Sequence, residues 1–139
     1  MSTDCLFCKI IAGDIPCTKV YEDDDVLVFM DIGPIIKGHA LVIPKSHTET
    51  IHDTPAEVLG KLILTAQRVA GAQMNGLQAD GVNIIQNNGE ASGQLVPHLH
   101  VHVIPRFADD GHRWNWAAKE YTDPAEMQAY AEKISAKML

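Results

Sequence analysis

The segment from His98 to Arg106 constrains the fold of this chain more than any other part of its sequence. Histidine alternates with an aliphatic residue over its first six positions, and Ile104, Pro105 and Arg106 follow. A period of two is typical of a β-strand, because successive side chains point to opposite faces. The pattern predicts a strand whose aliphatic side chains enter a core. Its other, exposed face carries three imidazoles roughly 7 Å apart, and imidazole attacks electrophiles, moves protons or binds metal near neutral pH.

Length and composition indicate one globular domain. The chain has 139 residues, of which 46% are hydrophobic, and this is enough for a packed core. No apolar run approaches the ~20 residues that span a bilayer. The first residues, from Met1 to Cys5, lack the basic and apolar stretches of a signal peptide. We therefore expect a soluble, cytoplasmic protein that does not contact membranes.

The charge and the cysteines narrow the choice of partners. A net charge of -7 argues against binding to a nucleic-acid backbone, although local histidines and backbone N–H groups can still hold a small anion. Three cysteines, Cys5, Cys8 and Cys17, are too few and odd in number for a disulfide framework. In a reducing compartment the C-x-x-C pair of Cys5 and Cys8 indicates metal or redox chemistry.

The hydrophobic pattern mixes helices and strands without regular alternation, which predicts an α+β fold. The expected elements are a short helix over residues 5–12, strands over 20–22, 26–30, 38–44 and 82–86, a long helix over 55–75 and a last helix over about 124–138. For the long helix we expect Thr54 as the cap, Pro55 at the first position and Glu57 completing a capping box. A polar loop over residues 87–94 leads into the histidine segment.

The order of these segments resembles that of the histidine triad (HIT) family. The resemblance rests on the three alternating histidines after a Gly-Gln pair, and on four further segments: Cys5–Ile11, Phe29–Asp31, Gly38–Lys45 and Asn87–Gly89. It covers about residues 5–107. It implies a homodimer with a HIT-like fold, in which a mainly antiparallel sheet is flanked by a long central helix and by N- and C-terminal helices.

The same resemblance implies a single HIT domain over residues 1–139, with a core over about 5–107. Residues 108–139 form a C-terminal extension that resembles nothing we can use. Within this extension, His112, Trp114 and Trp116 lie close together in the sequence and are expected to pack a C-terminal segment.

The activity that the resemblance implies is hydrolysis or transfer of a nucleoside monophosphate, usually AMP, from phosphoramidates or dinucleoside polyphosphates. His100 is expected to attack the α-phosphorus and form a nucleotidyl-histidine that water later hydrolyses. A backbone carbonyl that accepts the other N–H of this ring would fix its tautomer. His102, His39 and the N–H groups of the 93–96 turn are expected to contact the phosphoryl oxygens.

The resemblance also implies a binding site for a purine nucleotide of the AMP type. Asp31 is expected to accept the ribose hydroxyls, and Asn87 and Gln94 to lie near the phosphate and the leaving group. The apolar slot for the base consists of Phe7, Ile10, Phe29, Ile32 and Leu41. One branch of the family has a small hydroxyl residue after Gly-Gln where this chain has Leu95, which cannot donate a hydrogen bond to a leaving amine. The preferred leaving group therefore stays open.

The resemblance implies two further metal ligands beside the C-x-x-C pair. Some bacterial-type members of the family bind a structural zinc ion through two cysteines and two histidines, here Cys5, Cys8, His47 and His98, and zinc takes four such ligands. This arrangement leaves His100 and His102 for catalysis. Two alternatives remain at this point, a zinc-dependent hydrolase and a non-enzymatic nucleotide-binding or scaffold protein.

Overall fold

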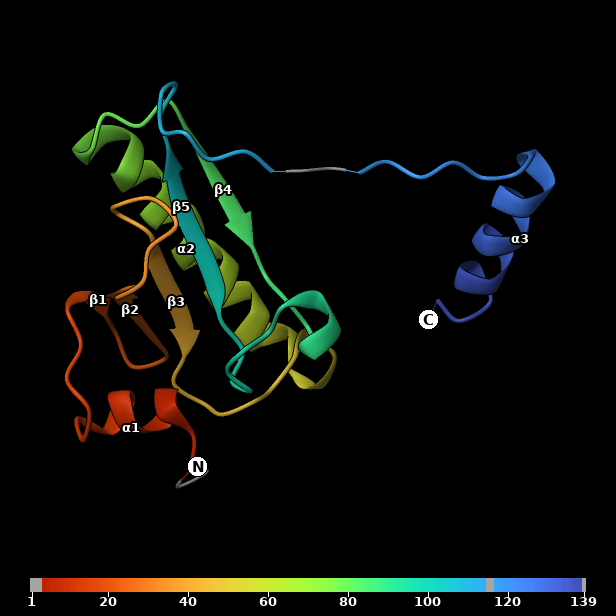
Figure 1. The fold of residues 1–139 in the computed structure, drawn as a ribbon. Helices are drawn as coiled ribbons and strands as arrows, with labels where there is room; N and C mark the ends of the chain where they lie inside the picture. Colours follow the sequence, from red (N-terminus) through yellow and green to blue (C-terminus); the bar gives the residue numbers. More distant parts are fainter. Residues whose placement is uncertain (1–3, 115–116, 139) are drawn as a thin grey trace.

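The chain folds into an α+β structure, as the sequence predicts, and its strands form one five-stranded antiparallel sheet (Figure 1). The structure is a computed structural model that describes residues 4–114 and 117–138. In chain order the elements are α1 (Leu6–Ala12), β1 (Lys19–Glu22), β2 (Val26–Met30), β3 (Ala40–Pro44), the 3-10 helix η1 (Ile51–Asp53), α2 (Ala56–Gly76), β4 (Gly81–Ile85), the 3-10 helix η2 (Glu90–Ser92), β5 (Val101–Arg106) and α3 (Pro124–Ser135).

The sheet has the strand order β1-β2-β3-β5-β4 and is covered on both faces at its centre. Side chains of β2 alternate between the two faces. Val26 and Val28 enter the core that α2 covers, whereas Leu27 and Phe29 pack with Phe7 of α1. Because both faces are covered, β2 and β3 read as continuous apolar runs instead of alternating ones. Each fully buried aliphatic side chain contributes about 1.5–3 kcal/mol to folding.

The histidine segment differs from the prediction in two ways. Strand pairing begins only at Val101, since the N–H of Leu99 instead donates to the carbonyl of Thr48 at 2.7 Å. The predicted exposed histidine face is also wrong, because His98 and His100 are buried, with 0% and 6% of their surface exposed. The cause is α1, whose Phe7 ring lies edge to face against both imidazoles. The aliphatic half of the prediction is confirmed, as Leu99 and Val101 enter the α2 core.

The capping box predicted for the long helix is wrong. Pro55 occupies the N-cap position of α2, and no side chain caps the helix there. The hydroxyl of Thr54 donates instead to the carbonyl of Thr50 at 2.6 Å. A side-chain cap is found one turn earlier, at η1, where the Asp53 carboxylate accepts a hydrogen bond from the backbone N–H of Thr50 at 2.8 Å. Because the Thr54 hydroxyl bonds to Thr50 and also lies 2.6 Å from Thr48 Oγ1, it does not cap the helix N-terminus.

The C-terminal region ends in α3, which Asp123 caps by accepting from the N–H of Glu126. The helix ends at Ser135, three residues earlier than predicted, and buries none of its residues. It lies apart from the sheet in Figure 1. His112 and Trp114 do contact each other, with ring centroids 4.7 Å apart, whereas Trp116 lies outside the described residues. No helix in the described part of the chain is long and apolar enough to cross a membrane.

Gly38 fixes the way the chain enters β3. Its φ angle is +103°, and a Cβ at this position would lie 2.7 Å from Leu77 Cδ1 and 2.9 Å from Pro105 Cγ. Its carbonyl accepts from Gln73 Nε2 of α2 at 3.0 Å, and the same amide donates to the carbonyl of Val103 at 2.9 Å. The turn before β3 is therefore tied to α2 and β5, and β3 begins two residues after the predicted start.

We predict that Gly38→Ala lowers the free energy of unfolding by about 2–4 kcal/mol, because the new Cβ adds backbone strain and overpacks the contact with Pro105. Gly60→Ala in α2 is the matched control. A Cβ there meets no atom within 4 Å, so we expect an unchanged or up to about 1 kcal/mol higher stability. Urea denaturation measures both, and equal stabilities of the two variants would contradict the prediction.

Candidate functional site

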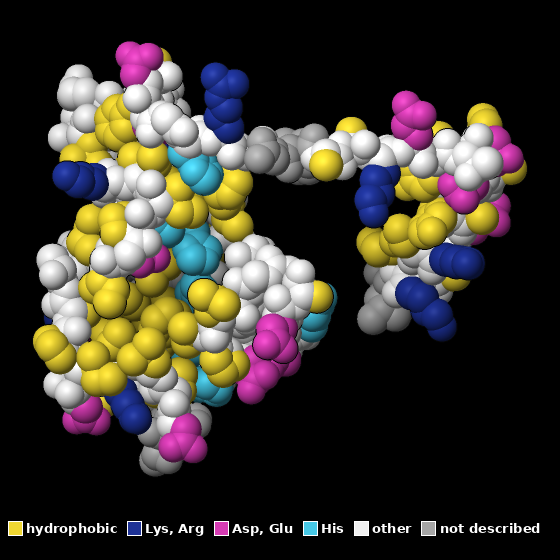
Figure 2. Space-filling model, in the orientation of Figure 1, with side chains coloured by type: hydrophobic (Ala, Val, Ile, Leu, Met, Phe, Trp, Pro, Cys, Tyr) yellow, Lys and Arg dark blue, Asp and Glu magenta, His cyan; other side chains and the backbone are white. Residues whose placement is uncertain are grey.

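A pocket of about 310 Å³ opens on the side of the sheet that α1 covers. Its walls contain all of the side chains predicted for the apolar slot, namely Phe7, Ile10, Phe29, Ile32 and Leu41. Asp31, His100 and His102 line the same pocket. Figure 2 shows hydrophobic side chains gathered around histidines on this part of the molecule. The structure thus brings an apolar slot, a carboxylate and two imidazoles to one place.

Several lining residues could not be found from the sequence. Ile15, Pro16 and Cys17 in the connection from α1 to β1 contribute to the wall, as do Leu95 and Val96 after η2. Residues in such connections follow no period, so no pattern in the sequence marks which of them face a pocket. Leu95 and Val96 are the exceptions, since both lie in the 93–96 turn that was expected to contact the phosphoryl oxygens.

His100 is held in one tautomer by the backbone. Its Nδ1 lies 2.6 Å from the carbonyl oxygen of His98. A carbonyl can only accept, so Nδ1 carries the proton and Nε2 keeps its lone pair. Burial lowers the pKa of His100, against the opposing effect of the His98 carbonyl, and this favours the neutral ring. The edge of Phe7, with its ring centroid 5.1 Å away, limits how far the ring can turn. His100 therefore keeps an unprotonated Nε2, which is the form that nucleophilic attack by an imidazole requires.

His39 and His102 form a hydrogen-bonded pair beside His100. The pairing of β3 with β5 brings His39 Nε2 to 2.9 Å from His102 Nδ1. The backbone N–H of Ile35 donates to His39 Nδ1 at 3.2 Å, so the proton of a neutral His39 is on Nε2 and donates to His102. His102 then carries its own proton on Nε2. The ring centroids of His100 and His102 lie 5.0 Å apart.

Burial also sets the charge of this pair. It lowers the pKa of His102 to about 4, an effect strengthened by His100 and His39 and opposed by Asp31. It lowers the pKa of His39 as well, again against the charge of Asp31, whose Oδ2 lies 3.5 Å from His39 Nε2. At neutral pH both rings are therefore neutral, and each presents one donor and one acceptor.

In the loop between β4 and the histidine segment, the amide of Gln94 is bonded to backbone groups. Gln94 Nε2 donates to the carbonyls of Glu49 at 2.7 Å and Val96 at 3.1 Å, and its Oε1 accepts from the N–H of Gly89 at 2.7 Å. Neither Gln94 nor Asn87 is among the residues that line the pocket. The Gln94 side chain thus holds the loop in shape instead of facing the pocket.

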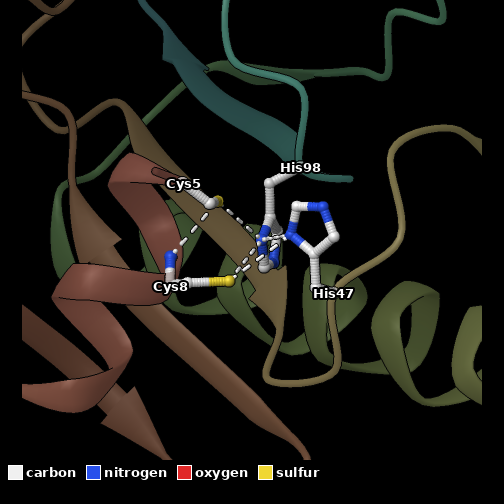
Figure 3. Close-up of side chains that lie close together, drawn as sticks. All are labelled: Cys5, Cys8, His47 and His98. Atoms are coloured by element: carbon white, nitrogen blue, oxygen red, sulfur yellow. Dashed lines mark hydrogen bonds between the residues drawn. The ribbon is translucent and has the colours of Figure 1, made fainter. Parts of the chain in front are cut away.

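The four predicted metal ligands converge on one point (Figure 3). Cys5 and Cys8 come from the start of α1, His47 from the segment after β3, and His98 from the segment before β5. Their ligand atoms all lie within 4.8 Å of one another. Cys5 Sγ is 3.3 Å from His98 Nδ1, and Cys8 Sγ is 3.4 Å from His47 Nδ1. Two sulfurs and two imidazole nitrogens are a donor set that could hold a metal such as zinc.

His98 is already oriented for this arrangement. Its Nε2 donates to the carbonyl of Pro44 at 2.9 Å, which leaves Nδ1 as the atom that faces the cysteines. A metal-bound histidine usually makes such a bond with its other nitrogen, because it fixes the ring orientation. Burial lowers the pKa of His98 to about 4, with further lowering from His47 and His100 and an opposing effect of Pro44. The neutral ring is the form that binds metal.

A second group of ligand atoms, in Asp31, His39 and His102, also lies within 4.8 Å. Here the hydrogen bonds argue against a metal. Because the N–H of Ile35 donates to His39 Nδ1, the nitrogen that would have to bind the ion holds the proton. This arrangement suits proton donation better than metal binding, and it disfavours the zinc-dependent hydrolase that the sequence left open.

Comparisons with known proteins agree with the geometry. Residues 12–109 match the family model described as the HIT domain. The protein hit of Bacillus subtilis is 41% identical over 138 residues, which cover 97% of this chain and 94% of that protein. An adenosine 5'-monophosphoramidase of Schizosaccharomyces pombe is 38% identical over 135 residues, 96% of this chain and 98% of that protein. An adenylylsulfatase of Arabidopsis thaliana is 42% identical over 110 residues, 79% of this chain and 56% of that protein.

Solved structures show the same fold. A crystal structure of a member of the HIT family from Bacillus subtilis has a TM-score of 0.90 at 40% identity, with 98% of both chains covered. A zinc-bound histidine triad family protein from Mycobacterium smegmatis has a TM-score of 0.78 at 37% identity, covering 99% of this chain and all of that one.

We predict that NMR spectra of the imidazole nitrogens show His102 neutral, with the proton on Nε2, from pH 8 down to about pH 5.5, and His39 neutral with the same tautomer at pH 8. Since folding lowers the pKa of His102 from 6.5 to about 4, the stability it contributes is complete above pH 6.5 and is lost as the pH falls toward 4. Asp31→Asn removes the negative charge that opposes both shifts, so it should lower both pKa values further. A charged His102 at pH 6 would contradict the assignment.

Proposed function

This chain belongs to the HIT domain family, and we propose that it is a nucleotide hydrolase or transferase that cleaves the bond beyond the α-phosphate of an AMP derivative. The observation that carries the proposal is the fixed tautomer of His100, whose Nδ1–H donates to the His98 carbonyl beside an apolar pocket. Relatives named as an adenosine 5'-monophosphoramidase and an adenylylsulfatase support an adenosine nucleotide as the substrate.

The proposed reaction has two displacements at phosphorus. The purine occupies the apolar slot that Phe7 and Phe29 help to line, and Asp31 accepts hydrogen bonds from the ribose hydroxyls. His100 Nε2 forms a bond to the α-phosphorus as the bond to the leaving group breaks, and the electron pair goes with that group. Water or another acceptor then attacks the phosphorus of the nucleotidyl-histidine, and the electron pair of the P–N bond returns to Nε2. Two displacements with lower barriers replace one difficult step.

The charge that builds up on the phosphoryl oxygens has three donors within reach. One is the Nε2–H of His102, which His39 directs by donating to the opposite nitrogen of the same ring. The others are the backbone N–H groups of Leu95 and Val96, which line the pocket and donate to no acceptor in the described part of the protein. Donors fixed in advance usually stabilise the transition state of such a reaction more than any other catalytic effect. In this scheme His39 is a positioning residue, and Gln94 shapes the loop.

We further propose that Cys5, Cys8, His47 and His98 bind a structural zinc ion. The convergence of two thiols and two Nδ1 atoms supports zinc, as does the zinc-bound relative from Mycobacterium smegmatis. The ion would supply a cross-link between α1, the segment after β3 and the segment before β5. It would leave Nε2 of His100 unligated for attack.

Two further expectations stay proposals. We propose the cytoplasm as the location, since none of the three cysteines, all in the described residues, forms a disulfide, and thiolate ligands persist in a reducing compartment. We also propose that residues 1–139 act as one domain within a homodimer. The exposed apolar side chains of α2, including Ile63 and Leu64, support an interface there.

We predict that His100→Ala lowers the turnover of an adenosine phosphoramidate more than about a thousandfold, because it removes the attacking atom. AMP should still bind, as the slot and Asp31 are unchanged. Mass spectrometry of the intact protein, quenched just after mixing, should show an added AMP in the wild type and none in the variant. Turnover that persists in His100→Ala would overturn the covalent mechanism.

We predict that the purified protein holds one zinc ion per chain, and that Cys8→Ser loses it. Zinc loss should lower the melting temperature by about 10 °C, since the ion stabilises only the folded state. Cys17→Ser is the matched control, because Cys17 lies outside the metal cluster and should keep full zinc content. Elemental analysis measures both variants. Equal zinc content in the two would overturn the assignment.

A further inference from the structure

The mouth of the pocket carries two aliphatic side chains that are open to solvent. Leu95 is 90% exposed and Ile32 is 102% exposed, and both line the pocket beside His100 and His102. Because they stay in contact with water, neither side chain contributes much hydrophobic free energy to folding. Val96, one residue after Leu95, packs against the buried cluster that contains Phe7 and Phe29, so the chain turns Val96 toward the base slot and leaves Leu95 at the opening. An aliphatic side chain at the opening of a binding pocket is a contact surface for whatever extends out of the slot.

The side of the pocket that Leu95 lines offers a leaving group no side-chain proton donor. The Gln94 amide is already bonded to the carbonyls of Glu49 and Val96, and the Ser92 hydroxyl donates to the carbonyl of Gly89. Among the described lining residues, His102 carries the one side-chain N–H that remains as a donor when His100 acts as the nucleophile. Lysine and arginine are also missing from the described lining, so a polyphosphate leaving group meets no cation there.

These features select among leaving groups by their chemistry. An amine is a poor leaving group unless it takes up a proton, and a positioned donor accelerates such a step by about 10²–10⁴-fold. A carboxylate departs as a stable anion and takes up no proton. A second nucleotide brings several negative charges into a mouth that is apolar and without cations, in a chain whose net charge is -7. An apolar carboxylate fits this mouth best.

On the basis of the proposed function, we propose that Leu95 determines specificity at this site, and selects mixed anhydrides of AMP with apolar carboxylic acids over phosphoramidates and dinucleoside polyphosphates. In the first step His100 Nε2 bonds to the α-phosphorus, and the bond from phosphorus to the carboxylate oxygen breaks. The electron pair stays on that oxygen, and the acid leaves as its anion with its hydrocarbon chain against Leu95. Water then attacks the phosphorus, the P–N bond breaks with its electron pair returning to His100 Nε2, AMP departs, and one proton of the water passes to solvent.

The test compares four substrates with the full-length protein: hexanoyl-AMP, acetyl-AMP, the N-hexyl phosphoramidate of AMP and diadenosine tetraphosphate. The leaving groups of hexanoyl-AMP and of the N-hexyl compound have six carbon atoms each but depart through oxygen and nitrogen, respectively. Wild-type kcat/KM should be highest for hexanoyl-AMP, and about three- to tenfold higher than for acetyl-AMP, because the longer chain contacts Leu95. Rates with His100→Ala are subtracted, since mixed anhydrides also hydrolyse on their own.

Two variants of Leu95 distinguish the effect of its hydrocarbon contact from the effect of the missing proton donor at this position. Leu95→Ala removes the hydrocarbon contact, so the ratio of hexanoyl-AMP to acetyl-AMP should fall to about one. Leu95→Ser adds a hydroxyl donor, so the ratio of phosphoramidate to acetyl-AMP turnover should rise at least about tenfold above that of Leu95→Ala. Because Leu95 is exposed, both variants should fold, and melting curves check this.

The outcomes distinguish the two proposals. If the wild type turns over the substrates faster than His100→Ala but the ratios do not respond to either Leu95 variant, the role of Leu95 is overturned and the proposed function stands. A wild-type preference for diadenosine tetraphosphate overturns the role of Leu95 in the same way. If the wild type is no faster than His100→Ala with any of the four, both proposals are overturned.

Discussion

His98 joins the two chemical centres of this protein, and the rest of the site depends on where it lies. Its ring points to Cys5 and Cys8, with Nε2 bonded to the Pro44 carbonyl, while its own carbonyl accepts the Nδ1–H of His100. Anything that holds the His98 ring in place therefore also fixes the tautomer of the proposed nucleophile. The proposed zinc ion would act in this way, since it would tie α1 to the segment that carries both histidines. A structural ion can then support catalysis while staying out of the reaction.

Burial of several imidazoles in one place has a cost that the structure offsets with fixed hydrogen bonds. His98, His100, His102 and His39 all have their pKa values lowered by burial, which keeps the rings neutral. Each neutral ring then needs one donor and one acceptor in the right places. Backbone groups define three of the tautomers, through the carbonyls of Pro44 and His98 and the N–H of Ile35. The fourth, in His102, follows from its bond to His39.

Much of the fold could be predicted from local patterns. The main errors arose where long-range contacts determine strand pairing and burial. The strand over residues 26–30 and the short first helix follow from apolar runs and their boundaries. The period of two in the histidine segment placed Leu99 and Val101 in the core correctly. The same period could not show that the segment 98–100 leaves the sheet, nor that α1 covers His98 and His100. The capping box at Thr54 failed for a local reason, because the hydroxyl donates to the carbonyl of Thr50, four residues earlier in the chain.

The sequence by itself determined the chemistry that is available, through the three alternating histidines, the C-x-x-C pair and the motif order that identified the family. These are properties of residue type and spacing, which one sequence can show. Tertiary structure alone decided which atoms meet. It showed that His39 bonds to His102, that Gln94 supports its loop, that the connection from α1 to β1 lines the pocket, and that Leu95 stands open at its mouth. Such contacts join residues tens of positions apart, and the strand pairing that creates them leaves no periodic trace in the sequence.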